Sequence, residues 1–327
     1  MAGNGEKKIK LLRIAGRLRG ARELNLIVII AVVSAVINIF QPTFLTLYNV
    51  QVISRQLAVF GLLSIAQTFV IIVLGIDLSV GSIVAFTGII TAMVFAATEN
   101  VVLAVGAALG FALLIGFYHG ILVTKVKMAP FVVTLGSLSI FRGLSFVLSR
   151  GYPILIRSPR IQWFGQGLIG PFPVPVVILF AVVVYTVFIL HFSKLGRYIY
   201  TIGGNPVAAR MSGVPVNAVI IYVYCQATLL ASIVGLIVAG RMAQGLASVA
   251  AGYELTAVAG AVIGGTSFLG GQGTVIGTVF GALVMSMIGN VLITLRVDAY
   301  WYNLVTGLII IVVVAADTLL AKRPKRT

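Results

Sequence analysis

Hydrophobic residues follow one another along most of this chain in runs long enough to cross a lipid bilayer. A spanning helix needs about 20 apolar residues, because each residue advances a helix by about 1.5 Å. Ten runs approach or exceed this length: 24–40, 57–74, 80–97, 101–123, 129–149, 172–192, 217–239, 254–269, 273–295 and 300–320. The run from Val101 to Val123 lacks the polar face of a soluble helix. The sequence therefore predicts an all-α, polytopic membrane bundle of about ten helices.

Two places in this pattern depart from simple spanning helices. The runs on either side of Gly75–Gly81 are only just long enough, and the run 254–269 is short and contains Gly264 and Gly265. Interrupted spans free backbone groups that must face protein or water, which is typical of transport pathways. Tight connections at the membrane surface are the alternative. A re-entrant 254–269 would place the basic C-terminus outside, so ten crossings is the preferred prediction.

Charge is scarce and unevenly placed. Only 9% of residues are charged, against about 25% in soluble domains, and the net charge is +16. Most Lys and Arg residues lie in the segment 1–23, in the tail 321–327 and in short connections. This is the positive-inside pattern of a membrane protein, so we expect both termini in the cytoplasm and no nucleic-acid partner. The segment 1–23 is either a basic amphipathic helix on anionic membrane lipid or a solvated tail.

The domain prediction follows from these runs. A basic cytoplasmic segment (1–23) precedes a transmembrane domain (24–320), which contains a cytoplasmic loop (193–216) and is followed by a basic tail (321–327). The first run is read as a retained span rather than a cleavable signal peptide. Cys225 is the only cysteine, so no disulfide within the chain is expected.

The cytoplasmic loop carries complete helix boundary signals. Asn205 is a favourable N-cap, Pro206 suits the first helical position, and Gly213 can take the left-handed conformation that ends a helix. The sequence therefore predicts a short helix over Pro206–Ser212. Such a helix can seat in a groove of a partner protein and transmit its movement. The alternative is a capped loop that only holds two spans in register.

Three ionisable residues lie in or near apolar runs, namely Asp77, Arg142 and Glu254. A charge within the membrane costs about 3 kcal/mol, so each needs a partner or water. Arg142 is the most deeply embedded. It either faces Asp77 or Glu254 as a gate, or it forms a structural salt bridge or lies at the interface.

Enzymatic signatures are absent from the sequence. There is no Gly-x-x-x-x-Gly-Lys-[Ser/Thr] loop, and His119 and His191 have no acidic or cysteine neighbours at metal-ligand spacing. We therefore expect no catalysis, no metal and no cofactor in this polypeptide. Glycines four residues apart on one helical face favour close helix packing, which can include a subunit interface. They are Gly273, Gly277 and Gly281, Gly106 with Gly110, and Gly116 with Gly120.

Several motifs in order resemble one family of membrane proteins. They are Gly75-Ile-Asp-Leu-Ser-Val-Gly-Ser82, Thr134-Leu-Gly-Ser137 with Phe141-Arg-Gly143, Leu195-Gly-Arg-Tyr-Ile-Tyr200, Gly203-Gly-Asn205 with Ala208-Ala-Arg-Met-Ser-Gly213, Gly252-Tyr-Glu-Leu255 and Ile263-Gly-Gly-Thr-Ser267 with Gly270-Gly-Gln-Gly273. From about Phe40 to Asp317 the chain resembles the permease subunits of ribose-type (monosaccharide) ABC importers. One departure is Thr256, where the family often has an aspartate.

The resemblance implies a function and a set of partners. The chain would be the permease subunit of an ATP-driven importer that carries a ribose-like sugar across the bacterial inner membrane. Its partners would be a separate cytoplasmic ABC ATPase, an extracytoplasmic sugar-binding protein, and a second permease copy or a paralogue. The alternative function is an ion-gradient-driven secondary transporter of a small polar solute.

Three groups of candidate site residues follow. The residues expected to couple the permease to the ATPase are Gly196, Arg197, Gly203, Gly204, Asn205, Pro206, Ala208, Ala209, Arg210, Ser212 and Gly213. The candidates for the translocation pathway or gate are Asp77, Ser79, Gly81, Ser82, Arg142, Glu254, Gly264, Gly265, Thr266, Ser267, Gly270, Gly271 and Gly273. Those expected to dock the binding protein, with anionic lipid as the alternative contact, are Arg55, Arg150, Arg157, Arg160 and Arg241.

Overall fold

The computed structural model describes residues 27–28, 30–32, 34–39, 41–295 and 298–321. The chain divides into two compact units, residues 1–50 and 51–327. In the first unit, the described residues between 27 and 39 are helical, in agreement with the predicted span 24–40. The predicted basic segment 1–23 lies outside the described residues, as does most of the predicted tail 321–327.

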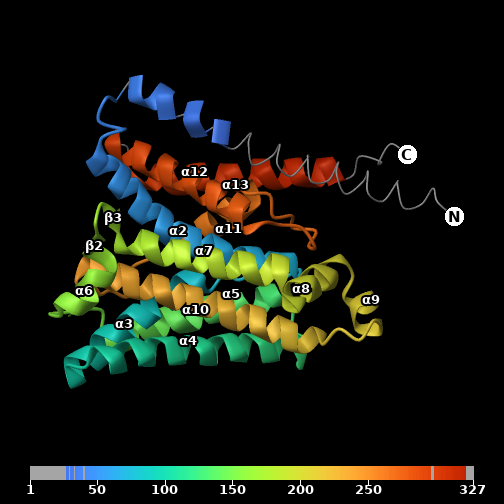
Figure 1. Cartoon of the computed structure of the whole chain (residues 1–327). Coiled ribbons are helices and arrows are strands. Elements are labelled where there is room, and N and C mark those ends of the chain that lie inside the picture. Colours follow the sequence, from blue (N-terminus) through green and yellow to red (C-terminus); the bar gives the residue numbers. More distant parts are fainter. Residues whose placement is uncertain (1–26, 29, 33, 40, 296–297, 322–327) are drawn as a thin grey trace. The chain divides into compact units, whose positions relative to one another are not determined.

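Long apolar helices make up most of the second unit (Figure 1). Within the described residues, seven helices are long and apolar enough to cross a membrane: α2 (Leu47–Ile72), α3 (Val80–Thr98), α4 (Val101–Thr124), α5 (Pro130–Ser149), α7 (Val174–Phe192), α10 (Val216–Met242) and α12 (Val275–Thr294). The last long helix, α13 (Ala299–Ala321), follows α12. The predicted polytopic helical bundle is confirmed.

Helix α10 lies among the other helices and packs against α3 and α4. Glycines permit the close approach of α4: a Cβ at Gly116 would meet the backbone of Cys225, and one at Gly120 would meet Ile221. Small residues bring helix backbones together in this way where lipid supplies no hydrophobic driving force. Gly116 and Gly120 therefore confirm the predicted packing role. Gly106 and Gly110, on the same helix, have no described atom within 4 Å of a Cβ.

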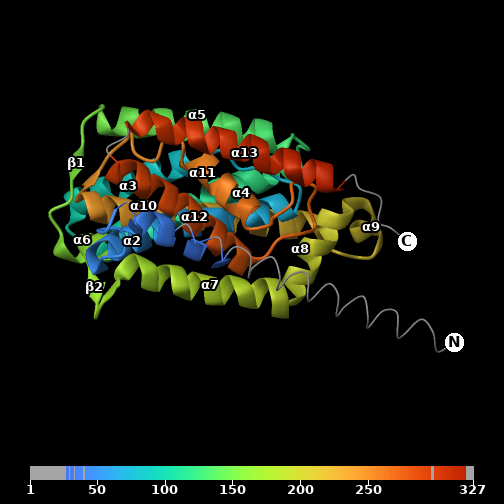
Figure 2. The same ribbon diagram turned by 90° about the horizontal axis from the view of Figure 1, so that it is seen from above.

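Short elements occupy the two ends of the second unit (Figure 1). At one end, β1 (Ile154–Leu155) pairs with β4 (Gln244–Gly245), β2 (Leu168–Ile169) pairs with β3 (Phe172–Pro173), and α6 (Pro159–Gln166) packs on α10. At the opposite end lie α8 (Lys194–Gly204) and α9 (Pro206–Met211). Viewed from above, in Figure 2, α8 and α9 again lie at the opposite end from α6 and β1.

The second interrupted span is shorter than the sequence suggested. Helix α11 covers only Tyr253–Ile263, which is about 16 Å of helix against a hydrocarbon core of about 30 Å. Beyond it, residues 264–274 form turns, with Gly265, Gly270 and Gly271 in the left-handed region. The helix predicted over 254–269 therefore ends early. Glycine readily takes positive φ angles, and a right-handed helix cannot continue through residues in that conformation.

Candidate functional site

Helices α8 and α9 form a compact projection, which we call the handle. The Asn205 side-chain oxygen accepts hydrogen bonds from the backbone N–H groups of Val207 and Ala208, both at 3.0 Å. Pro206 occupies the first turn of α9. The short capped helix predicted over Pro206–Ser212 is therefore confirmed to within one residue. Asn205 satisfies N–H groups that a helix start leaves unpaired, which fixes α9 at a defined angle to α8.

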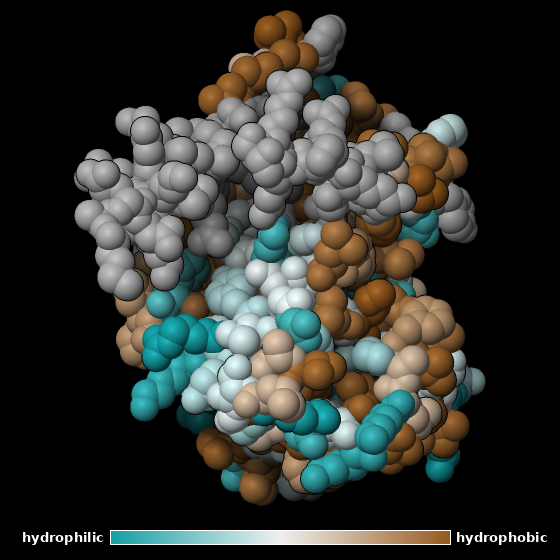
Figure 3. Space-filling view, turned by 90° about the vertical axis from the view of Figure 1, so that its right-hand side faces the viewer, coloured by the Kyte–Doolittle hydropathy of each residue, from teal (hydrophilic) through white to brown (hydrophobic). Residues whose placement is uncertain are grey.

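The exposed side of the handle mixes apolar and basic groups. Val207 is 73% exposed and Met211 is 85% exposed, while Arg210 donates a hydrogen bond of 3.4 Å to Asn217. Figure 3 faces this end of the molecule and shows hydrophilic and hydrophobic side chains side by side on its lower part. Exposed apolar side chains on a rigid helix, beside a cation, suit contact with a protein groove.

Glycine contacts attach the handle to the membrane helices. A Cβ at Gly203 would collide with the carbonyl oxygen of Ile72 and with the backbone of Gly271. The Gly271 N–H also donates to the Ile72 carbonyl at 2.9 Å. We call this three-residue contact of Ile72, Gly203 and Gly271 the glycine junction. Beside it, the Tyr200 hydroxyl donates to the Gly273 carbonyl at 2.8 Å, so α8 holds the chain at two places.

The glycine junction joins two interrupted segments, 73–79 after α2 and 264–274 after α11. Leu74 takes a left-handed conformation with φ 65° and contacts the position of a Cβ at Gly270. Behind this contact, the Thr68 hydroxyl lies 3.3 Å from that of Thr266 and 2.6 Å from that of Thr278. Both interrupted spans predicted from the sequence therefore meet directly beneath the handle.

Tight glycine packing fixes segment 264–274 against α12. A Cβ at Gly264 would meet the backbone of Gly277, and a Cβ at Gly281 would meet the carbonyl of Gly260. The predicted close packing along the face of Gly277 and Gly281 is thereby confirmed. Small residues of this kind let helix backbones approach closely, so no side chain lies between segment 264–274 and α12 at these contacts.

Segment 73–79 is held by polar groups inside the bundle. The Asp77 carboxylate accepts hydrogen bonds from the N–H and the hydroxyl of Ser79, and the Ser82 hydroxyl donates to the Ser79 carbonyl at 2.7 Å. The Gln67 amide donates to the Asp77 carbonyl. Asp77, Ser79 and Ser82 are all fully buried. They shape the turn that begins α3, and a role in contacting substrate stays a prediction.

Arg142 holds the loop of residues 246–252, which connects β4 to α11. Its guanidinium donates to the carbonyl oxygens of Ala247 at 2.7 Å and Val249 at 2.6 Å. Loop 246–252 needs such donors, because carbonyls outside helices are costly within a membrane. Arg142 forms no ion pair with Asp77 or Glu254 among the described residues.

Glu254 stands where this loop enters α11. One carboxylate oxygen accepts from the Gly252 N–H at 3.2 Å, and the other lies where a Cβ at Gly81 would be. Glu254 interacts electrostatically with both Arg142 and Asp77. The structure therefore gathers the three predicted gate charges in one region, around the starts of α3 and α11.

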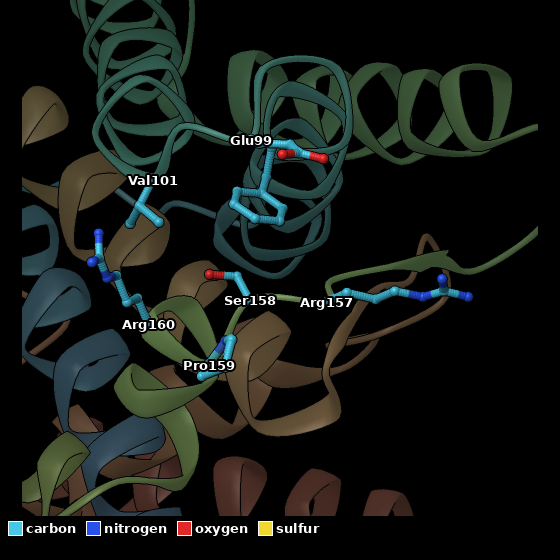
Figure 4. A pocket seen from close by; sticks show the side chains of 7 residues that line it. Glu99, Val101, Arg157, Ser158, Pro159 and Arg160 are labelled. Carbon is cyan, nitrogen blue, oxygen red and sulfur yellow. The ribbon is translucent and has the colours of Figure 1, made fainter.

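The candidate docking arginines lie at the other end, around α6. The Arg55 guanidinium donates to the Gln166 carbonyl at 3.3 Å, and the Gln166 amide donates to the Arg241 carbonyl at 3.1 Å. Arg157 and Arg160 line a pocket of about 370 Å³ together with Glu99. Figure 4 shows these two arginines on opposite sides of Ser158. Four of the five predicted arginines thus gather around one short helix, while Arg150 ends α5.

Comparison with known proteins identifies the family. Residues 49–314 match the family described as branched-chain amino acid transport system / permease component. The chain belongs to this family. The permease is 36% identical to the ribose import permease protein RbsC of Escherichia coli (strain K12) over 299 residues, which is 90% of this chain and 93% of the relative.

Two further relatives support the assignment. The RbsC protein of Bacillus subtilis (strain 168) is 36% identical over 86% of this permease and 88% of its own length. The D-allose transport system permease protein AlsC of Escherichia coli (strain K12) is 36% identical over 90% of this permease and 91% of its own length. No solved structure matches the chain.

Some structural residues of this permease were not anticipated. Ile72, Leu74 and Tyr200 complete the contact between the handle and the interrupted segments. Ile72 and Leu74 read as ordinary apolar residues in the sequence, and Tyr200 is marked only as the last residue of a family motif, without a contact of its own. Their roles come from backbone atoms and from one hydroxyl. No sequence pattern marks such contacts, although the unusual density of glycine at 264–273 indicates that backbones approach closely there.

Proposed function

We propose that this permease imports a monosaccharide across the bacterial inner membrane as the transmembrane subunit of an ABC importer. The relatives named for ribose and D-allose support a sugar as the cargo, because each matches nearly the whole chain. The family description names branched-chain amino acids instead. Leucine is therefore the informative competing substrate in any test.

The observation that carries the proposal is the capped handle fixed to two interrupted spans. Its partner is a separate cytoplasmic ABC ATPase, whose groove receives the exposed Val207 and Met211 side chains. When the ATPase binds ATP, α9 moves with it, and α8 passes this movement through the glycine junction to segments 73–79 and 264–274. The handle end is then cytoplasmic, and ATP hydrolysis belongs to the partner and not to this chain.

The gate in this proposal is the group of charges around Glu254. Arg142 holds loop 246–252 through two carbonyls, and Glu254 lies against the start of α3 at Gly81. A shift of segment 73–79 alters the position of Gly81 and so the fit of Glu254. Two permease subunits, either two copies of this chain or this chain and a paralogue, enclose the sugar pathway between them.

The opposite end receives the loaded sugar-binding protein. Arg157 and Arg160 flank the pocket beside Glu99, and Arg55 and Arg241 lie around the other end of α6. Carboxylates of the binding protein pair with these arginines and orient it over the permease, since complementary charge accelerates and directs protein docking.

Reconstituted transport tests this function. The permease is placed in proteoliposomes with a candidate cytoplasmic ABC ATPase and a candidate sugar-binding protein from the same organism, and labelled ribose, allose, glucose and leucine are supplied. We expect sugar uptake that requires ATP and both partners, with no uptake of leucine. Leucine uptake would overturn the sugar assignment. Sugar uptake driven by a sodium or proton gradient without ATP would instead establish a secondary transporter.

A further inference from the structure

A cluster of buried polar side chains lies around segment 73–79, and the coupling path described above does not account for its unpartnered atoms. Asp77, His119 and Gln67 are each 0% exposed, and Tyr224 is 1% exposed. They come from segment 73–79, α4, α2 and α10, so four separate parts of the chain direct polar groups into one region of the bundle.

None of these side chains is fully satisfied by the protein. Within the described residues, Asp77 Oδ2, His119 Nδ1, Gln67 Oε1 and the Tyr224 hydroxyl have no hydrogen-bond partner. The remaining polar atoms of Asp77, His119 and Gln67 do have partners: Asp77 Oδ1 accepts from Ser79, His119 Nε2 lies 2.8 Å from the Ser137 hydroxyl, and the Gln67 amide donates to the Asp77 carbonyl. An unsatisfied buried polar atom costs about 1–3 kcal/mol, and four such atoms in one place require an explanation.

Contacts with segment 73–79 bring these groups together. The Gln67 amide donates to the main-chain carbonyl of Asp77, and a Cβ at Gly75, two residues before Asp77, would lie 2.8 Å from the Tyr224 hydroxyl. The rings of His119 and Tyr224 stand edge to face with centroids 6.0 Å apart. Polar groups that are near one another but too far apart to bond directly are commonly bridged by water.

Gly75 contributes a close backbone contact on the segment itself. A Cβ at this position would lie 2.8 Å from the Tyr224 hydroxyl and 2.9 Å from Cγ1 of Val70, so glycine lets the backbone of segment 73–79 approach that hydroxyl directly. A buried water molecule needs two to four polar partners, and this region offers an anionic acceptor, an amide oxygen, a hydroxyl and an imidazole nitrogen.

We propose that Asp77, His119, Tyr224 and Gln67 form a binding site for ordered water beneath segment 73–79. Bridging water completes the hydrogen bonding of the Asp77 carboxylate without a protein cation. Water also exchanges partners easily, so segment 73–79 can shift while Asp77 remains solvated. Bound water therefore adds exchangeable hydrogen bonds to the side-chain bonds that already hold this segment.

Hydroxyl-radical footprinting by X-ray radiolysis tests this site on the full chain in lipid nanodiscs. Radicals formed from a bound water label neighbouring side chains even where bulk solvent has no access. We expect Tyr224 and His119 to be labelled several-fold faster than Phe86, after correction for intrinsic reactivity. Phe86 is a suitable reference, because it is 5% exposed and packs against the rings of Phe111 and Phe141. Labelling of Tyr224 no faster than Phe86 would overturn the proposal.

Two additional arms separate water from other occupants. Asp77→Asn keeps a polar side chain and should retain fast labelling of Tyr224, whereas Asp77→Leu should reduce it to the rate of Phe86. Fast labelling that persists in a folded Asp77→Leu protein would also contradict the site. The wild-type measurement is repeated in sodium, potassium and choline chloride, and we expect equal rates. Protection of Tyr224 by sodium or potassium alone would assign the site to that cation instead.

Discussion

The glycine junction makes its sharpest prediction at Gly203. In Gly203→Ala, the new methyl group meets the Ile72 carbonyl and the Gly271 backbone, with the Gly271 Cα at 2.8 Å. Neither neighbour is a side chain that can rotate away, so α8 must move off the interrupted segments. Inserting a methyl group into packed surroundings costs about 1–3 kcal/mol, and the 2.9 Å bond between Gly271 and Ile72 is strained at the same time.

This free-energy cost weakens the contact through which the handle is proposed to move segments 73–79 and 264–274. A shift of 1–3 kcal/mol between two linked states corresponds to about a 5- to 150-fold change in their ratio. We therefore expect ATP-driven sugar uptake by Gly203→Ala to fall at least several-fold, while the ATPase still co-purifies with the permease. Uptake into proteoliposomes and recovery of the ATPase on affinity resin measure the two effects separately.

The neighbouring glycine supplies the matched control. Gly204 is in the same helix, and among the described residues a Cβ placed there would meet no atom within 4 Å beyond its chain neighbours and the nearby backbone of α8. Although Gly204 is among the predicted coupling residues, a methyl group there does not reach the glycine junction, so Gly204→Ala should leave uptake unchanged. If the two alanine variants transported sugar equally well, the handle would not act through the glycine junction, and the reasoning above would be refuted.

Three further substitutions test other contacts. Asn205→Ala removes the cap of α9 and should cost about 1 kcal/mol; faster hydrogen exchange at the Val207 and Ala208 amides measures it, and unchanged exchange would argue against the cap. Arg142→Leu removes the donor to the part-buried Ala247 and Val249 carbonyls and should cost about 1–3 kcal/mol for each carbonyl left unpaired; a lower unfolding temperature and loss of uptake are expected, and wild-type behaviour would show that Arg142 does not hold this loop. Arg157→Glu should weaken docking of the loaded binding protein, measured by its affinity for permease nanodiscs, whereas Arg150→Glu, outside the pocket, should change it less. Equal effects of these two reversals would point to general electrostatics.

The sequence was most informative where hydrophobicity or helix caps decide the structure. Apolar runs predicted the long helices, since a membrane accepts little else, and Asn205 with Pro206 predicted α9 to within one residue. The boundaries were weaker. Helix α2 begins at Leu47 rather than at residue 57, because its first turns include polar residues such as Asn49 and Gln51 that no hydrophobic count includes.

Tertiary contacts account for what the sequence did not predict. Helix α6 has few apolar residues, and α8 is a short amphipathic helix that was predicted only as part of a loop. The sequence singled out Arg142 and Glu254 as charges in need of partners. It did not reveal that carbonyls of loop 246–252 would satisfy Arg142, because carbonyl groups are present at every residue and carry no sequence signal.

A cross-link at Met211 tests whether the partner moves the permease through the handle. Met211→Cys is introduced into a Cys225→Ala background, and the complete transporter is treated with a short cross-linker that has a thiol-reactive group at one end, which attaches to Cys at position 211, and a photoreactive group at the other, which inserts into any adjacent protein on illumination. We expect a covalent product between α9 and the ATPase, and ATP-driven uptake that stops in proportion to its formation. If uptake proceeded at its full rate and position 211 never cross-linked to another protein, the coupling role of the handle would be contradicted.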